Sequence, residues 1–428
     1  MSSSTEFRAD TPLQLQHIPF TFDSQRCDES AIDLVEALNP DWKNEDGPIT
    51  LKKFTDGITN TLMKATKERP SQTASENEDD SVLIRTYGEG TDALIDRERE
   101  LRSHSLLATL GLAPPLLARF NNGLMYRFIQ GTVCTPEDLR RPEVYRAVAK
   151  RLGQWHGLLP ISAISTTSRA DNVVPKSNGV LIEDESSPIP NLWTVTQSWI
   201  EALPSTTETE KERNAMLSTE LKWLLTKLGG TRGLDGKDYV FSHCDLLSGN
   251  VIMHGHPASE KTATNGDAEV CVSFIDYEYA TPAPAAFDIS NHFAEWAGFD
   301  CDHNYVPTKS ARRDFLQSYV RSFRQYSRLS PENAEDATKA MTVADDDAEI
   351  NKDVDEIYAQ VDLFRGVPGL YWGVWALVQE TISQIDFDYA TFARLKLGEY
   401  FDWKAELDGT RAKEEKKLGV REAKWAQE

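Results

Sequence analysis

The stretch FSHCDLLSGNVIMHGHP, residues 241–257, decides how the second half of this chain is built. It places His243, Asp245 and Asn250 between two short runs of apolar and β-branched residues, which are typical of buried strands. A third run of this kind, VCVSFID, ends at Asp276. We expect the second and third runs to pair as a hairpin, which would set Asp276 beside Asn250.

These polar side chains have the chemistry of a phosphoryl-transfer site, which needs a carboxylate to accept a hydroxyl proton and oxygen ligands for magnesium. The spacing from Asp245 to Asn250 matches the D-x-x-x-x-N of kinase catalytic loops. Taken singly, a turn explains Asp245 and caps explain Asn250 and Asp276. Their joint occurrence, in this order and at strand ends, favours the catalytic interpretation. We interpret His243 as a structural hydrogen-bonding residue of the loop rather than its base.

The first part of the chain predicts a small α+β lobe. A helix is expected over residues 29–42, and the apolar runs in 49–66 and 81–88 predict strands joined by the polar segment 67–81, an exposed hairpin loop. A helix over 92–110 ends at a Gly-then-Pro signal, and two further strands surround the Asn-Asn-Gly turn at 121–123.

The second part of the chain is mainly helical. Its first strong helix, residues 142–159, carries apolar side chains on one face. The segments 161–190 and 330–356 are interpreted as surface insertions whose role is solvation. The predicted organisation has four parts: an N-terminal tail and helix (1–45), a nucleotide-binding lobe (46–132), a catalytic and substrate-binding lobe (133–410) and a charged, solvated C-terminal tail (411–428).

Composition narrows the class of partner. The 428 residues carry a formal net charge of −22, which repels nucleic acid and anionic lipid surfaces. No apolar run is long enough to span a bilayer, and the N-terminus lacks the profile of a signal peptide. The five cysteines are scattered without a C-x-x-C pair, so neither a disulfide framework nor a zinc site is indicated. We therefore expect a cytoplasmic protein without stable membrane insertion, and both a monomer and a homodimer stay open.

The first lobe offers candidates for the nucleotide side of the site. The turn DGITNTL, between two predicted strands, presents Gly57, Thr59 and Asn60 to a phosphate. Arg85 lies on a predicted strand where its charge could reach nucleotide phosphates, and Glu100 on the following helix is its best acidic partner. Solvation on an exposed strand is the competing explanation for Arg85.

The sequence blocks DGITNTL, VLIRTYGEGTDALIDRERE, FNNGLMYRFIQG, FSHCDLLSGNVI, FIDYEYATPAPAAFDISNHFAEWAG and LYWGVWALVQ resemble the choline/ethanolamine kinase family, in order from about Gly57 to about Phe401. The resemblance implies a two-lobed, protein-kinase-like fold and phosphoryl transfer from MgATP to the hydroxyl of a small amino alcohol. It makes Asp245 the catalytic base. It assigns the magnesium ligands to Asn250 and Asp276, with Glu278 near a second ion, and it makes Phe128, Ile129 and Gln130 the hinge that contacts adenine.

The same resemblance implies the substrate-binding residues. Asp288 corresponds to a structural carboxylate that supports the catalytic loop, and Glu295 to the acid that faces the substrate ammonium. Trp372 and Trp375 lie one helical turn apart, so both rings can face a cation. Without the resemblance, an aromatic stripe at this spacing is usually core.

Small residues after Glu295, Ala297 and Gly298, resemble the ethanolamine branch of the family. The expected activity is therefore phosphorylation of ethanolamine to phosphoethanolamine, the entry to the CDP-ethanolamine route to phosphatidylethanolamine. The alternatives are phosphorylation of choline, or of both alcohols, and a catalytically silent pseudokinase used as a scaffold. A protein kinase is disfavoured because H-R-D and D-F-G blocks are missing from the sequence.

Overall fold

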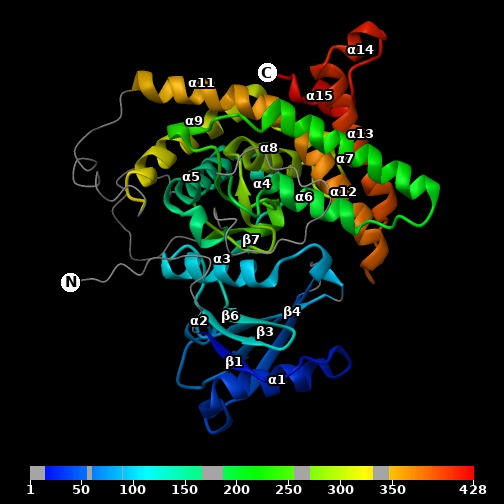
Figure 1. The fold of residues 1–428 in the computed structure, drawn as a ribbon. Coiled ribbons are helices and arrows are strands. Elements are labelled where there is room, and N and C mark those ends of the chain that lie inside the picture. The colour runs from blue at the N-terminus through cyan, green and yellow to red at the C-terminus, as the bar shows by residue number, and fades with distance from the viewer. Residues whose placement is uncertain (1–14, 55–59, 89, 166–186, 255–269, 331–346) are drawn as a thin grey trace. The chain divides into compact units, whose positions relative to one another are not determined.

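The computed structural model describes residues 15–54, 60–88, 90–165, 187–254, 270–330 and 347–428. Contacts divide the chain into two compact units (Figure 1). Of the described residues, the N-terminal unit contains those in 15–132 together with Ile382–Phe387, and the C-terminal unit contains those in Val133–Thr381 and Asp388–Glu428. The boundary after Thr132 coincides with the predicted end of the first lobe.

The N-terminal unit is built on a six-stranded sheet with the order β1-β5-β6-β4-β3-β2. Its strands are β1 (Gln16–Ile18), β2 (Ile49–Phe54), β3 (Asn60–Lys67), β4 (Val82–Tyr87), β5 (Leu116–Phe120) and β6 (Gly123–Arg127). All neighbouring strands are antiparallel except β1 and β5, which run parallel. The predicted strands on either side of the Asn-Asn-Gly turn are β5 and β6, and the helix that follows β4 is α3 (Arg97–Thr109).

The first helix, α1 (Cys27–Leu38), packs on this sheet (Figure 1). Leu34 and Val35 of α1 are fully buried in one cluster with Ile84 of β4, and Trp42 belongs to the same cluster. The sequence predicts an N-terminal tail and helix apart from the lobe, whereas the described residues from Gln16 onward supply part of the lobe's own core. Apolar side chains on one face of α1 account for the difference, because they need a surface to pack on.

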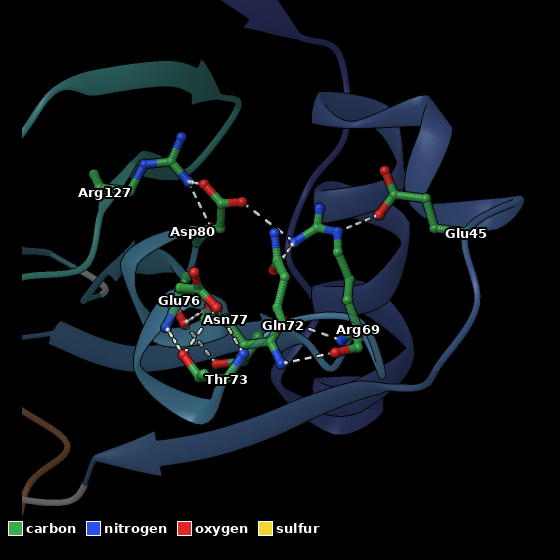
Figure 2. Close-up of polar contacts among 10 residues, drawn as sticks. Glu45, Arg69, Gln72, Thr73, Glu76, Asn77, Asp80 and Arg127 are labelled. Atoms are coloured by element: carbon green, nitrogen blue, oxygen red, sulfur yellow. Dashed lines mark hydrogen bonds and ion pairs between the residues drawn. The ribbon is translucent and has the colours of Figure 1, made fainter.

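The connection between β3 and β4 is ordered rather than an open loop. It contains the short helix α2 (Ala74–Asp79), which begins with a reciprocal cap between Thr73 and Glu76. Arg69 holds the connection in place, since Nε donates to Glu45 Oε2 at 2.7 Å and Nη1 to Asp80 Oδ2 at 3.2 Å (Figure 2). The predicted hairpin of β3 and β4 is confirmed, but its exposed connection is a capped helical turn.

The C-terminal unit contains two long helices in close contact, α5 (Pro142–Leu158) and α9 (Lys309–Ser327). The predicted apolar face of α5 is confirmed, because the following side chains have no exposed surface: Val144, Val148, Leu152 and Trp155. A Cβ atom at Gly153 would lie 2.5 Å from Tyr319 O of α9. Glycine at this position therefore permits the close approach of the two backbones.

Four short strands and one helix form the centre of the C-terminal unit. They are β8 (Val240–Ser242), β9 (Val251–His254), β10 (Cys271–Phe274), β11 (Thr281–Ala283) and α8 (Ala285–Glu295). β9 and β10 pair antiparallel, as do β8 and β11. The hairpin predicted from the sequence is therefore confirmed.

The remaining elements are β7 (Thr132–Val133), α4 (Pro136–Leu139), α6 (Leu192–Ala202), α7 (Glu208–Leu228), α11 (Asp347–Phe364), α12 (Val367–Ile382), α13 (Tyr389–Leu407), α14 (Thr410–Lys413) and α15 (Val420–Trp425). Seven short 3-10 turns complete the described part of the chain. No helix in the described residues is both long enough and apolar enough to cross a membrane.

Two predictions of solvated segments differ from the structure. The predicted insertion 330–356 includes the first half of α11, where Ile350 and Val354 are buried on the apolar face that continues to Val361. At the chain end, Trp425 is buried and its Nε1 donates to Asp362 Oδ1 at 2.5 Å. In α11 the acidic side chains concealed the apolar spacing, whereas in α15 two of the charged residues are themselves buried beside Trp425: Arg421 and Glu422.

Candidate active site

The loop between β8 and β9 carries Asp245 and returns the chain to Asn250, the residue before β9. Asn250 Nδ2 donates to the backbone oxygen of Asp245 at 2.7 Å and to Asp245 Oδ2 at 3.0 Å. This amide therefore fixes both the backbone and the carboxylate of Asp245. Asp245 is buried, with 8% of its surface exposed.

The pairing of β9 and β10 brings Asp276 to the same place. Val251 is opposite Phe274, and the backbone N–H of Ile275 donates to Asn250 O at 3.0 Å. Asp276 follows directly and has a φ of 66°. Cys244, the neighbour of Asp245, has a φ of 64°. Positive φ at a residue that is not glycine is strained backbone, which is enriched at functional sites.

Asp288 of α8 supports the loop, as the sequence predicts. Its Oδ2 accepts a hydrogen bond from His243 N at 2.9 Å, and its Oδ1 accepts one from Cys244 N at 2.7 Å. Oδ2 also lies 2.9 Å from Nε2 of His156 on α5. Asp288 has no exposed surface, so burial raises its pKa. The hydrogen bonds from His156 and the backbone N–H of His243 outweigh this effect and hold the pKa of Asp288 below its usual range.

His243 has the structural role that the sequence predicts. Its Nε2 lies 3.0 Å from Ile275 O, and its Nδ1 accepts from Asp245 N at 3.3 Å. Nε2 therefore carries the proton, and both ring nitrogens are occupied. Burial is the main cause that lowers the pKa of His243 to about 4. A neutral ring with both nitrogens engaged cannot act as the base of the site.

Asp245 interacts electrostatically with three other acidic side chains. Burial, and then the negative charges of Asp276, Glu295 and Glu278, raise the pKa of Asp245 well above its usual range. Keeping these buried acids ionised is costly unless cations neutralise their negative charge. Among the described residues, no group of three or more His, Cys, Asp or Glu side chains could hold a metal ion. Asn250, Asp276 and Glu278 offer a smaller set of oxygen atoms, which suits Mg²⁺ because this ion is usually completed by water and substrate phosphates.

Trp372 and Trp375 of α12 pack edge to face, with ring centroids 5.5 Å apart. Trp372 Nε1 donates to Oδ1 of Asn291 on α8 at 2.8 Å, and Trp375 Nε1 donates to Tyr279 OH at 2.7 Å. Tyr279 directly follows Glu278, so this hydrogen bond connects Trp375 to the segment that carries Glu278. The rings of Trp372 and Trp375, called the aromatic wall below, are nearly buried and pack among other aromatic side chains.

Glu295, the last residue of α8, is 5% exposed. Its Oε1 is buried and has no hydrogen-bond donor among the residues that the structure describes. Lys396 Nζ of α13 lies 3.8 Å away, which is ion-pair distance but beyond hydrogen-bond distance. Burial raises the pKa of Glu295 above its usual range. A buried carboxylate oxygen without a donor is costly, which makes it a candidate acceptor for a ligand.

In the N-terminal unit, Arg85 Nη1 of β4 lies 3.3 Å from Glu100 Oε1 of α3. Arg97 Nη1 donates to the other oxygen, Glu100 Oε2, at 3.0 Å. The predicted pairing of Arg85 with Glu100 is confirmed. Arg85 is 4% exposed, so the competing explanation of a solvated strand residue is wrong.

Of the predicted phosphate turn, Gly57 and Thr59 lie outside the described residues, and Asn60 begins β3. In the predicted hinge, Phe128 N donates to Ser81 O at 2.9 Å, so this N–H is already used by the sheet. Gln130 Nε2 donates to Asp79 Oδ1 of α2 at 2.8 Å. Contact of Phe128, Ile129 and Gln130 with a nucleotide stays a prediction.

The family model described as choline/ethanolamine kinase matches residues 51–401. The chain belongs to this family. The kinase is 30% identical over 395 residues to ethanolamine kinase 1 of Mus musculus, a match that covers 90% of this chain and 92% of the relative. It is 32% identical over 380 residues to ethanolamine kinase 2 of Homo sapiens, with coverage of 87% and 80%. The predicted class, an ATP-dependent kinase of this family, is confirmed by these matches.

Solved structures confirm the predicted fold. An ethanolamine kinase of Plasmodium vivax matches with a TM-score of 0.64 at 23% identity, covering 88% of this chain and 89% of that one. A choline kinase of Cryptosporidium parvum matches with a TM-score of 0.56 at 19% identity, covering 89% and 97%. The kinase therefore has the protein-kinase-like fold of these enzymes, with a mainly antiparallel sheet followed by a mostly helical region.

Sequence reasoning missed several residues of the kinase's site. Asn291 Nδ2 donates to Cys244 O at 2.9 Å, and His292 Nδ1 lies 2.7 Å from Leu246 O, so both bind the catalytic loop. A signal was present, because the polar residues of α8 recur at helical spacing on one face: Asp288, Asn291, His292 and Glu295. No comparable sequence pattern indicates that Lys396 lies close to Glu295.

Proposed function

We propose that this kinase transfers the γ-phosphoryl group of MgATP to the hydroxyl group of ethanolamine, giving phosphoethanolamine and ADP. The relatives named above support ethanolamine as the acceptor. The observation that carries the proposal is Glu295 Oε1, a buried carboxylate oxygen without a donor among the described residues. A primary ammonium can donate to this oxygen, whereas the quaternary group of choline has no N–H.

Asp245 is the proposed base. The substrate hydroxyl attacks the γ-phosphorus, a new O–P bond forms, and the bond from the γ-phosphorus to the bridging oxygen breaks to release ADP. The hydroxyl proton passes to a carboxylate oxygen of Asp245. Asn250 holds Asp245 Oδ2 at 3.0 Å, which fixes the direction from which Asp245 accepts this proton.

Asn250, Asp276 and Glu278 are the proposed magnesium-binding residues. Magnesium would supply positive charge to the phosphate oxygens on which negative charge develops. The acidic character of the site supports this assignment, because burial and the negative charges of Asp276 and Glu278 raise the pKa of Asp245, and a bound cation would offset those charges. Arg85, held by Glu100, is proposed to contact the nucleotide phosphates.

The aromatic wall supports a second acceptor. Trp372 and Trp375 could face the methyl groups of choline, since rings attract a cation through their faces. Ethanolamine is the preferred acceptor, because its N–H groups can donate to Glu295 Oε1, which has no donor among the described residues. Activity on both alcohols is the alternative outcome.

The deciding experiment is a steady-state panel with MgATP and with ethanolamine, its methylated derivatives and choline as acceptors. We expect kcat/KM to be highest for ethanolamine and to fall with each added methyl group. A choline kcat/KM equal to or above that of ethanolamine would overturn the acceptor. Asp245→Asn keeps the size of the side chain and removes the base, so we expect a loss in kcat of about a thousandfold. Binding of ATP without turnover of any acceptor would indicate a pseudokinase.

All five cysteines are free thiols. Free thiols suit a reducing compartment and support a cytoplasmic location, where the product would enter phosphatidylethanolamine synthesis. Cell fractionation tests the location directly, and recovery of the kinase in the membrane pellet would contradict it.

A further inference from the structure

Lys396 of α13 is an ammonium group enclosed in the C-terminal unit, with only 2% of its surface exposed. Burying a lysine is costly unless acids compensate for its lost hydration. Two acids do so here: Glu295 of α8, at 3.8 Å, and Glu399, which lies one turn further along α13 and interacts with Lys396 through its charge. The lysine therefore lies between an acid of the proposed substrate site and an acid outside it.

Glu399 is itself held from two further sides. His303 Nε2 lies 2.7 Å from Glu399 Oε1, and Arg421 Nε of α15 lies 3.8 Å from Glu399 Oε2. Further ionisable groups face Lys396, Glu295 and Glu399 from the catalytic loop, from the segment after α8 and from α15: Asp245, Cys301, His303 and Arg421.

The positive charge of Lys396 lowers the pKa of both acids, but only Glu399 ends below its usual value. Burial raises the pKa of Glu399, but the charge of Lys396, the hydrogen bond with His303 and the charge of Arg421 outweigh burial and lower it to about 2. Burial raises the pKa of Glu295, and Lys396 offsets this only in part. The acids also act on the lysine, since their charges outweigh burial and raise the pKa of Lys396.

The position of Lys396 connects this cluster to the aromatic wall. Lys396 Nζ lies 5.2 Å from the ring centroid of Phe392, and the Phe392 ring lies 6.5 Å from that of Trp375. The lysine therefore borders the same wall that we propose for the substrate. Its Nζ lies 3.8 Å from Glu295 Oε1, beyond hydrogen-bond distance, so this buried oxygen has an ion-pair partner but no hydrogen-bond donor among the described residues.

We propose that Lys396 is a positioning residue that keeps Glu295 ionised and its Oε1 open to the substrate's primary ammonium, while Glu399 limits how strongly Lys396 holds Glu295. This inference rests on the proposed function of Glu295. Lys396 is not a catalytic residue, because it acts through Glu295. With Glu399 absent, the lysine would be drawn to Glu295 and would compete with the substrate for the same oxygen.

Substitutions at Lys396 and at Glu399 should shift the pKa of Glu295 in opposite directions. Lys396→Met removes a positive charge, so Glu295 becomes ionised only at higher pH. Glu399→Gln removes a negative charge and keeps an acceptor for His303, so Glu295 becomes ionised at lower pH. A purely structural contribution would move both variants in the same direction, or would leave the pH profile in place.

The experiment measures kcat/KM for ethanolamine between about pH 5 and about pH 9 at saturating MgATP, because this ratio reports the ionisation of the free enzyme. The acid limb is the part of the profile in which kcat/KM falls as the pH is lowered. We expect the pH at its midpoint to rise by about one unit in Lys396→Met and to fall in Glu399→Gln. At neutral pH, KM for ethanolamine should rise about tenfold in Lys396→Met with KM for ATP unchanged. Lys396→Arg keeps the charge and should return the limb toward that of the wild type.

Lys404→Met is the matched control. Lys404 lies on the same helix, pairs with Glu220 at 2.5 Å and contacts none of the groups in the cluster. It should leave the acid limb unchanged. If Lys396→Met does not fold, the downward shift in Glu399→Gln carries the test alone. An unchanged acid limb in Glu399→Gln, or a shift in the same direction as in Lys396→Met, would overturn the inference. The wild-type acceptor panel is measured separately, so a wrong acceptor is distinguished from a wrong role of Lys396.

Discussion

Asn250 binds Asp245 twice, donating from Nδ2 to its backbone oxygen at 2.7 Å and to its carboxylate Oδ2 at 3.0 Å. One amide therefore orients the proposed base, and its own carbonyl oxygen remains for the proposed metal site. The kinase thus connects the position of the base to the position of the metal through a single side chain.

Asn250→Ala should lower kcat by at least about a hundredfold and raise the Mg²⁺ concentration that gives half-maximal rate. Both effects follow because the variant removes the orienting donor and a proposed ligand together. Mg²⁺ titrations at saturating ATP and ethanolamine measure them. Asn304→Ala is the control, since Asn304 lies in a 3-10 turn and bonds only to the exposed Asp302. An unchanged Mg²⁺ requirement in Asn250→Ala would remove Asn250 from the metal site.

Asp288→Asn should destabilise the C-terminal unit by about 3 kcal/mol, because a buried charged acceptor is replaced by an amide that presents an N–H to other donors. The donors affected are His243 N and Cys244 N. Urea unfolding measures the change. Asp314→Asn on α9 is the matched control: its ion pair with Arg146 is partly exposed, so we expect less than about 1 kcal/mol. Equal losses in the two variants would argue against a special role for Asp288.

Arg85→Met should raise KM for ATP about tenfold and leave KM for ethanolamine nearly unchanged, since the variant removes a buried cation proposed for the nucleotide phosphates. Arg119→Met tests the same substitution on β5 of the same sheet, where the arginine is half exposed and pairs with Glu98 at 3.4 Å. Comparable changes in KM for ATP in both variants would contradict the proposed nucleotide contact.

The stability of the kinase should fall as the pH is lowered from 6.5 toward about 4, in part through His292. Burial lowers the pKa of His292 to about 4, so between these values the unfolded chain binds a proton that the folded chain does not. Trp296 Nε1 donates to His292 Nε2 at 3.1 Å, which leaves no room for a second proton on the ring. The contribution of His292 is fully present above 6.5 and is lost as the pH falls toward about 4.

Urea unfolding at a series of pH values measures this loss, which amounts to about 3 kcal/mol for a shift of this size. His292→Gln does not titrate in this range and keeps an acceptor for Trp296. Its unfolding free energy should therefore depend less steeply on pH than that of the wild type, and identical slopes would show that His292 does not contribute.

Gly153→Ala should destabilise the kinase by about 2 kcal/mol, because the added Cβ would meet Tyr319 O at 2.5 Å and force α5 and α9 apart. Gly398→Ala is the matched control, since α13 has open space at that position. It should stabilise the kinase by about 0.5 kcal/mol through helix propensity. Thermal unfolding compares the two variants, and a neutral Gly153→Ala would show that α5 and α9 can adjust their spacing.

Structural features that are determined by residues close together in the sequence were predicted correctly. The strands around Asp245 and Asp276, the apolar face of α5 and the strand pair at the Asn-Asn-Gly turn are confirmed, because alternation and periodicity act within a few residues. The same reasoning failed for the start of α11, where dense acidic charge concealed the buried face, and for α15, where Arg421 and Glu422 are buried by tertiary ion pairs that local sequence does not indicate.

The sequence by itself determined the family, the order of the acids along the chain and the identity of the proposed base, since these reside in local motifs. Only the tertiary structure decided which distant groups control those acids. Lys396 of α13 lies 3.8 Å from Glu295 of α8, although the two residues are far apart in the sequence. A buried charge acquires its role from the charges around it, and helix packing brings those charges together from positions far apart in the sequence.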